Sequence, residues 1–137
     1  MIIEVEGAPP TRGTPGSAGG DLRARHFHTF PPGTRHKVKT GVKVAIPHGY
    51  VGLVIARSSL VDNFGLKLAN SVGVIDSDNR NEIMLHLENV TDQEVRVASG
   101  DRLAQLIIVP CYMDAFIEAD LDETSRGDGG FGSTGIN

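Results

Sequence analysis

Apolar and polar residues alternate along several short stretches of this chain, and turn-forming residues separate the stretches. The alternation is clear in residues 42–46, 83–87 and 95–97, with clusters of Gly, Pro, Asn and Asp between them. A period of two indicates half-buried strands, and turns at short intervals favour an antiparallel sandwich, barrel or jelly roll over alternating strands and helices. Because 137 residues suffice for one domain with one core, we predict a single all-β domain.

The run of residues 103–109 departs from this alternation. Its sequence, LAQLIIV, is apolar throughout except for Gln105. Such a run is typical of a strand that is buried on both faces, so we predict a central strand here. The Gln105 amide then needs a hydrogen-bond partner inside the protein. Helical character is limited to residues 58–63, which is too short a segment to change the fold class.

Charge and cysteine content exclude several classes of function. The chain has 13 Lys and Arg against 17 Asp and Glu, so it lacks the positive field that non-specific nucleic-acid binding requires. No apolar stretch reaches the roughly 18 residues of a membrane helix, and the N-terminus has no signal-peptide pattern. One cysteine, Cys111, allows no intrachain disulfide. We expect a soluble protein of the cytoplasm, or of the host-cell cytoplasm if viral, with no membrane and no direct nucleic-acid partner.

The last twelve residues, RGDGGFGSTGIN, differ sharply in composition from the rest of the chain. Five of the ten residues 126–135 are glycine, which leaves too little apolar surface for the segment to order itself. Arg126 supplies a forked cation, and Ser133 and Thr134 supply hydroxyls. Phe131 offers a flat face for a nucleobase. The segment is either a disordered terminus or a tail that closes on a nucleotide; a P-loop is excluded because it would need a Lys.

A second polar segment, ARSSL, follows a predicted strand over residues 50–55. It places the cation of Arg57 and the hydroxyls of Ser58 and Ser59 at the end of that strand. Side-chain hydroxyls and backbone N–H groups at such a point favour an anion-binding site. A solvated turn is the alternative.

Residues 70–80, NSVGVIDSDNR, form the third segment. We predict a short hairpin that turns at residues 70–73 and delivers Asp76 at its end. The exposed main-chain donors and acceptors of a hairpin match the edge of uracil. Asp76 at the edge of the core is placed to act as a general base on a water molecule. The alternative is that Asp76, Ser77 and Asp78 only form a turn.

Two further positions complete the set of polar groups. Asp21 follows a glycine-rich approach, and Gln105 lies in the predicted central strand. A single carboxylate suits hydrated Mg²⁺, which prefers few carboxylates, several waters and phosphate oxygens, although Asp21 is equally compatible with a turn. His26 and His28 alternate on a predicted strand, and this spacing does not indicate a zinc site.

Taken in order, these five segments resemble the five motifs of the trimeric dUTPase family, and they span residues 17–135. Their order, their spacing and the C-terminal RGDGGFGSTG are jointly far more specific than any one of them. The resemblance implies a β jelly roll, or distorted barrel, over residues 1–125 and a flexible Gly-rich tail over residues 126–137. It further implies a homotrimer with shared active sites that hydrolyses dUTP to dUMP and pyrophosphate with Mg²⁺, keeping uracil out of DNA and supplying dUMP for dTMP synthesis.

The resemblance also implies a role for each segment. Asp76 would orient the water that attacks the α-phosphorus, and Asp21 would reach Mg²⁺ through water. Contacts to uracil and the sugar would come from Asn70, Ser71, Val72, Gly73, Val74 and Asn79. Contacts to the phosphates would come from Arg57, Ser58, Ser59 and Gln105. Contacts from the tail to the γ-phosphate and the base would come from Arg126, Phe131, Gly132, Ser133 and Thr134.

The chain departs from the family pattern at three positions. Asn79 stands where the family usually has a Tyr whose ring packs on the deoxyribose and excludes a 2′-hydroxyl. Gly20 stands where a Tyr is usual, and Asn81 where a Gly is common. We therefore expect activity with weaker rejection of UTP, unless another residue compensates at the sugar.

Two other functions remain open from the sequence. A dCTP deaminase shares the fold and an Arg-Ser-Ser segment, but it lacks the glycine-rich tail and places a Glu on the strand after the third motif. This chain has His86 at that position, with Glu88 two residues further on the same face. The other alternative is a nucleotide-binding regulator that keeps the pocket and acts through a partner protein.

Overall fold

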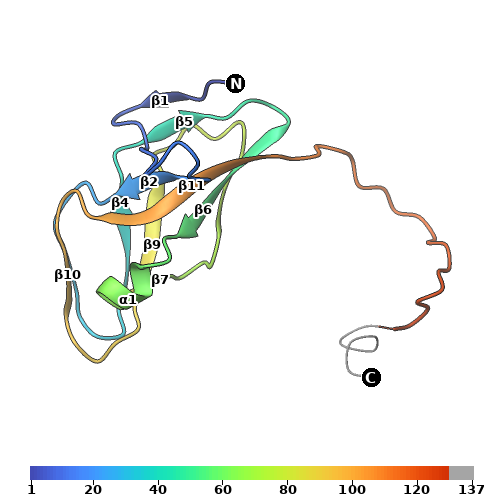
Figure 1. The fold of residues 1–137 in the computed structure, drawn as a ribbon. Coiled ribbons are helices and arrows are strands. Elements are labelled where there is room, and N and C mark those ends of the chain that lie inside the picture. The colour runs from blue at the N-terminus through green and yellow to red at the C-terminus, as the bar shows by residue number, and fades with distance from the viewer. Residues whose placement is uncertain (130–137) are drawn as a thin grey trace.

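The computed structural model describes residues 1–129, and within them every regular element except one short helix is a strand (Figure 1). The all-β prediction is therefore confirmed. The elements are β1 (Glu4–Glu6), β2 (Gly20–Arg23), β3 (His28–Phe30), β4 (Arg35–Lys39), β5 (Lys43–Ala45), β6 (Tyr50–Ala56), α1 (Leu60–Phe64), β7 (Leu66–Leu68), β8 (Gly73–Ile75), β9 (Met84–Asn89), β10 (Val95–Val97) and β11 (Arg102–Pro110). None of the described helical segments is long and apolar enough to cross a membrane.

The strands form four antiparallel sheets around one core. The largest has the order β2-β11-β6-β8, and a second has the order β4-β9-β7. Two ribbons, β1-β5 and β3-β10, complete the distorted barrel. Neighbouring strands come from distant parts of the chain, since β2 pairs with β11 and β6 pairs with both β11 and β8. The sheets thus bring segments that are far apart in the sequence onto a common surface.

The predicted alternation accounts for the core. Every second residue of two stretches is buried: Val42, Val44, Ile46, Ile83, Leu85 and Leu87. Their neighbours in sequence point away from the core, as the pleat of a strand requires. A buried polar residue, Asn89, lies among them, and its amide donates to the carbonyls of Phe30 and Gln93. Its oxygen accepts from the Thr91 amide and hydroxyl, so the buried group is satisfied.

β11 is the central strand that the sequence predicted, but it is buried on one face only. Leu106 on the inner face is buried, whereas Ile107 and Val109 on the outer face are half-buried in this single chain. The register places Ile107 beside Leu53 of β6, and Leu53 beside Val74 of β8. Residues directly opposite on neighbouring strands point to the same face. The outer face of the sheet therefore carries a partly exposed apolar row.

The predicted hairpin around residues 70–73 is wrong in its pairing. The turn exists, with the Ser71 amide bonded to the Leu68 carbonyl and a positive φ of 62° at Ser71. The strands on either side, however, belong to different sheets, because β7 pairs with β9 and β8 pairs with β6. Local turn residues indicated the reversal but could not indicate which strands would pair.

The predicted helical segment forms α1, a helix that buries Leu60. It ends at Gly65, which has a φ of 66° and donates its N–H to the Val61 carbonyl. Glycine is favoured there because other residues are strained in the left-handed region.

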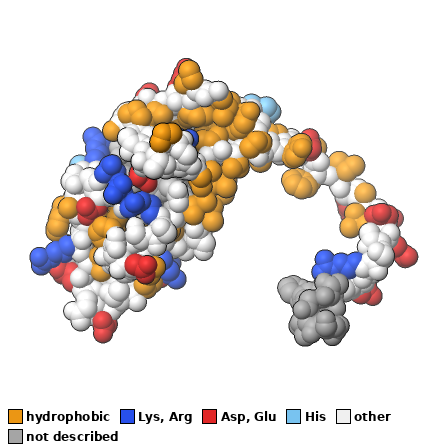
Figure 2. Space-filling model, viewed as in Figure 1, with side chains coloured by type: hydrophobic (Ala, Val, Ile, Leu, Met, Phe, Trp, Pro, Cys, Tyr) orange, Lys and Arg blue, Asp and Glu red, His pale blue; other side chains and the backbone are white. Residues whose placement is uncertain are grey.

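After β11 the chain leaves the body as an extended arm, residues 111–129 (Figure 1). The arm begins well before residue 126, where the change in composition placed the boundary. Figure 2 shows apolar side chains continuing from the body onto the arm. The large apolar side chains that stay exposed on it are Tyr112, Met113, Phe116, Ile117 and Leu121.

Candidate active site

Polar side chains from three separate segments meet at one end of the large sheet. Asp21 of β2 is largely buried, with 13% of its side chain exposed, and its Oδ1 lies 3.3 Å from Arg57 Nε. Its Oδ2 lies 3.7 Å from Arg102 Nη1. Arg57 directly follows β6 and Arg102 begins β11, so strand pairing brings both cations to the same carboxylate. Figure 2 shows Lys and Arg side chains gathered over β2 and the start of β11.

These residues line a cavity of about 210 Å³, together with Ser58 and Gln105. The Gln105 amide donates to the Ala56 carbonyl at 3.4 Å, which supplies the partner that the sequence required. Gly19 lies against Gln105, because a Cβ on Gly19 would come within 2.6 Å of the Gln105 oxygen. Two guanidinium groups, a hydroxyl and an amide facing one hollow form an arrangement suited to phosphate oxygens. We call this the cationic end of the sheet.

Arg102 was missed in the sequence reading, although it adjoins the segment that contains Gln105. A single Arg after a Gly-Asp turn carries no signal by itself. Its importance depends on the pairing of β11 with β2, which sets Gln105 opposite Asp21. Ser59, which was predicted to contact phosphate, accepts a bond from Arg57 at 3.3 Å and does not line the cavity.

Asp76 lies in a different cavity, of about 510 Å³. It directly follows β8, and Val51 of β6 and Ser77 line the same cavity. Cys111 and Met113, at the base of the arm, also line it. The Asp76 carboxylate is exposed, and within residues 1–129 no side-chain hydrogen bond or ion pair holds it. We call this the Asp76 end of the sheet.

The predicted uracil-reading segment adjoins the Asp76 end. Val74 lines the Asp76 cavity and is 58% exposed. Asn70, Ser71 and Val72 are also exposed, whereas Gly73 packs on Val54. The turn before β8 is thus exposed and lies next to Asp76.

The loop after Asp76 is held by its own hydrogen bonds. The Asn79 amide donates to the Asp76 carbonyl at 3.1 Å, which closes a turn. The Asn79 side-chain oxygen accepts from the Asn81 amide at 2.9 Å, so this side chain is turned back onto the loop. Asn79 does not line the Asp76 cavity. The position where a Tyr would meet the sugar is thus occupied by a loop-stabilising residue.

The two ends of the sheet are far apart within one chain. Val51 lies at the Asp76 end of β6, and Arg57 follows the other end of the same strand. At about 3.3 Å for each residue of strand, the path from Val51 to Arg57 is roughly 20 Å. A single copy therefore does not bring Asp76 to the cationic end.

The tail residues can be placed only in part. Arg126 is exposed on the arm and contacts neither cavity. The predicted contacts from Phe131, Gly132, Ser133 and Thr134 lie outside the described residues.

The residues at the cationic end could hold a metal ion only if other molecules supplied most of its ligands. Within the described residues no group of three or more His, Cys, Asp or Glu side chains is placed to hold a metal. Asp21 supplies one carboxylate, and two guanidinium groups already flank it. Mg²⁺ accepts a site with one carboxylate if waters and phosphates supply its other oxygens. The site thus fits an ion that arrives with a nucleotide and not a resident ion.

Three histidines lie near one another away from both ends. Burial lowers the pKa of His28 below its usual value, and positive charge on His26 and His36 lowers it further. The buried Nε2 of His28 has no hydrogen-bond partner among the described residues. Within the described residues, these histidines belong to no group of three or more His, Cys, Asp or Glu side chains that could hold a metal ion.

Glu88, the acidic residue that a dCTP deaminase could use, is held in ion pairs away from both cavities. Glu88 lies on β9, in the second sheet, and its carboxylate is 3.2 Å from Lys67 and 3.9 Å from Arg35. It lines neither the Asp76 cavity nor the cationic cavity. The geometry therefore gives Glu88 a place in a surface ion-pair network.

Comparison with known proteins agrees with this geometry. The dUTPase family model matches residues 6–135. A deoxyuridine 5′-triphosphate nucleotidohydrolase of Cutibacterium acnes is 46% identical over 98% of this chain and 90% of its own length. The corresponding protein of Desulfitobacterium hafniense is 48% identical over 93% of this chain and 87% of its own length. The structure of the Staphylococcus bacteriophage 80alpha dUTPase with dUPNHPP is 25% identical and similar at a TM-score of 0.88, covering 98% of this chain and 99% of that one. The chain belongs to the dUTPase family.

Proposed function

We propose that this protein hydrolyses dUTP to dUMP and pyrophosphate by attack of water on the α-phosphorus, in active sites shared between the copies of a homotrimer. Membership of the dUTPase family supports the reaction. The observation that carries the shared site is the separation of Asp76 from Arg57 along β6. The reaction would keep uracil out of DNA and supply dUMP for dTMP synthesis, with the cytoplasm as the proposed compartment.

The shared site follows from what each end of the sheet lacks. The cationic end has groups for phosphate but no free carboxylate for a water, because Asp21 is paired with Arg57 and Arg102. The Asp76 end has the free carboxylate but no Lys or Arg among the described residues that line it. Each end of one copy is complemented by the opposite end of another. Closed rotational symmetry repeats such a contact around a ring, as a trimer requires.

The outer face of the large sheet supplies a surface for this assembly. Leu53, Val74 and Ile107 form an apolar row on this face, in which Val74 is exposed and Leu53 and Ile107 are partly exposed. Burying such a row against a second copy is favourable at about 25 cal/mol for each Å² removed from water. The arm carries further exposed apolar side chains that would gain from the same contact.

The cationic end would bind the phosphates. Arg57 and Arg102 would place two forked cations on the phosphate oxygens, while Ser58 and Gln105 would supply neutral donors and Ser59 would help to hold Arg57. Asp21 keeps both guanidinium groups in position before the substrate arrives. Preorganised donors of this kind stabilise the negative charge that develops on the oxygens around phosphorus, and they need no rearrangement during the reaction.

Asp76 would act as the general base. Its exposed carboxylate is free to accept a proton from a water molecule and to contact the 3′-hydroxyl of the sugar. Asn70 and the backbone of residues 71–74 would read the edge of uracil, and their exposure beside Asp76 supports this. Asn79 would leave the 2′ side of the sugar less crowded than a Tyr ring would.

Enzymes of this family generally use Mg²⁺, and the site fits an ion that is delivered with the nucleotide. We propose that Asp21 holds this ion through water. The ion would add positive charge to the phosphates.

The tail would complete the site over a neighbouring copy. Arg126 would pair with the γ-phosphate, Phe131 would stack on the base, and Gly132, Ser133 and Thr134 would donate to phosphate oxygens. The arm supports this role, because it carries the chain away from its own body before residue 126 (Figure 1).

Release of pyrophosphate from dUTP, UTP, dTTP and dCTP in the presence of Mg²⁺ tests the proposal. We expect turnover of dUTP, slower turnover of UTP, and negligible turnover of dTTP and dCTP. Binding of dUTP without turnover would favour the regulator, and release of ammonia from dCTP would favour the deaminase. Either result would contradict the proposed reaction.

A further inference from the structure

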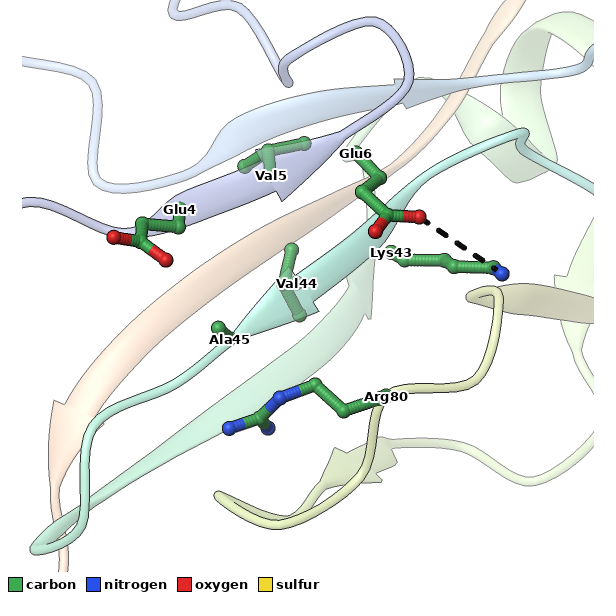
Figure 3. A pocket seen from close by; sticks show the side chains of 7 residues that line it. All are labelled: Glu4, Val5, Glu6, Lys43, Val44, Ala45 and Arg80. Carbon is green, nitrogen blue, oxygen red and sulfur yellow. Dashed lines mark ion pairs between the residues drawn. The ribbon is translucent and has the colours of Figure 1, made fainter.

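A second groove lies behind the loop that carries Asp76. It has a volume of about 400 Å³ and is lined by β1, β5 and Arg80. Figure 3 shows Arg80 reaching from the loop along β5 toward Ala45, while Lys43 is paired with Glu6 on β1 at 4.0 Å. Arg80 does not line the Asp76 cavity. Its guanidinium therefore lines this groove and not the cavity of the proposed substrate.

Arg80 nevertheless contacts the part of the loop that adjoins Asp76. Its Nη1 donates to the Ser77 carbonyl at 2.6 Å and approaches the Asn79 carbonyl at 3.4 Å. Ser77 lines the Asp76 cavity, whereas Arg80 lines the groove behind it. One charged hydrogen bond thus connects the two sides of the loop, directly after the proposed general base.

The rest of the loop is attached elsewhere. At its far end the Glu82 carboxylate accepts from the Gly41 amide at 2.9 Å, and the Ile83 amide bonds to the Val42 carbonyl. Those bonds fix the return of the chain to β9. At the near end, the bond from Arg80 to Ser77 is the side-chain contact that restrains the residue next to Asp76.

We propose that Arg80 is a positioning residue, which holds the Asp76 carboxylate in the direction required for water attack by bonding Ser77 from behind. This inference rests on the proposed function of Asp76. Because Arg80 bonds Ser77 but does not line the cavity, its loss changes the orientation of the base and leaves the binding of nucleotide unchanged. A misplacement of about 1 Å at a reacting group can cost up to about a hundredfold in rate.

The test compares Arg80→Ala with Lys43→Ala, a matched variant that removes a cation from the same groove without touching the loop. We expect kcat for dUTP to fall at least about tenfold in Arg80→Ala while KM stays within about twofold. Lys43→Ala should keep the kcat of the unaltered protein. Arg80→Lys should recover most of the rate, because an ammonium group can also donate to the Ser77 carbonyl.

Affinity for the non-hydrolysable analogue dUpNHpp and the melting temperature complete the experiment. Both should be nearly unchanged in Arg80→Ala, since the side chain is exposed and does not line the cavity of the proposed substrate. An unchanged kcat would overturn the inference. So would a raised KM with unchanged kcat, which would mean that Arg80 contacts substrate, or an equal loss in Lys43→Ala, which would mean that only charge matters. If the unaltered protein does not hydrolyse dUTP, the proposed function fails first.

Discussion

The cationic end and the Asp76 end of the large sheet differ in how much of the site one chain builds. At the cationic end, Asp21 is held between Arg57 and Arg102. At the other end, the Asp76 carboxylate is exposed and has no side-chain partner among the described residues. One end is assembled within the chain, whereas the other is left open.

The difference follows from the charge of the groups at each end. Two guanidinium groups repel each other, so a carboxylate between them is needed to hold them together without substrate. A general base has the opposite requirement, because a carboxylate that is already paired accepts a proton less readily. Groups that bind the substrate can form ion pairs before it arrives, whereas the carboxylate that accepts a proton must remain unpaired.

The largest expected effect comes from Asp76→Asn. We expect kcat to fall by about a thousandfold, since the amide cannot accept the proton from water. Binding of dUpNHpp should persist, because the phosphate groups are untouched. Asp78→Asn is the matched control, as it removes the same charge from the same cavity, and it should cost less than tenfold. A near-full rate in Asp76→Asn would remove the base from the mechanism.

Mixed assemblies test whether the two ends work across copies. Asp76→Asn and Arg57→Met should each be inactive alone. When they are co-expressed with different tags and isolated as mixed trimers, one site in each trimer, about a third of all sites, should combine an intact Asp76 with an intact Arg57 from another copy. Activity should therefore return to about that fraction of the unaltered rate. No recovery would place both residues in one copy's site.

Removal of one cation should have a smaller effect. We expect Arg102→Met to raise KM for dUTP about tenfold or more and to lower kcat, because one forked donor to phosphate is lost. Arg23→Met is the control. Arg23 lies opposite Arg102 in the sheet, but it donates to the Gly100 carbonyl and does not line the cavity. Equal losses of activity in both variants would mean that the effect comes from removing any positive charge in this region.

The sugar side of the Asp76 end should respond to Asn79→Tyr. A ring at this position would crowd the 2′ carbon, so we expect the ratio of kcat/KM for dUTP over UTP to rise several-fold. The substitution also removes the Asn79 side-chain bond to the Asn81 amide, and a melting curve will report any cost to the loop. An unchanged ratio would mean that another residue rejects the 2′-hydroxyl.

The smallest expected effect concerns His28, which lies away from both ends of the sheet. It concerns the stability of the fold and not the proposed active site. The pKa of His28 is lowered in the folded state, so the unfolded chain takes up its proton first as pH falls. Stability should therefore decrease as pH falls through the ordinary value of 6.5 toward the lowered value. The melting temperature should drop between about pH 7.5 and 5.5, and less so in His28→Gln. Equal drops would assign the acid sensitivity to other groups.

Much of the fold was predictable because its signals are local. Alternation at Val42, Val44 and Ile46 indicated a strand, and all three residues are buried. The segments that carry Asp21, Arg57 and Asp76 were also found, because each combines reactive side chains with turn residues. The hairpin at residues 70–73 was not predictable, since the same turn residues serve whether or not the flanking strands pair with each other.

The sequence by itself thus determined the fold class and the family, and it predicted residues for the chemistry. Only the tertiary structure decided which of them meet. It joined Arg102 to Asp21 through the pairing of β11 with β2, and it separated Asp76 from Arg57 along β6. The physical reason is that a side chain's chemistry and its preference for strand or turn belong to the local sequence. Strand order and register depend on how distant segments pack around one core.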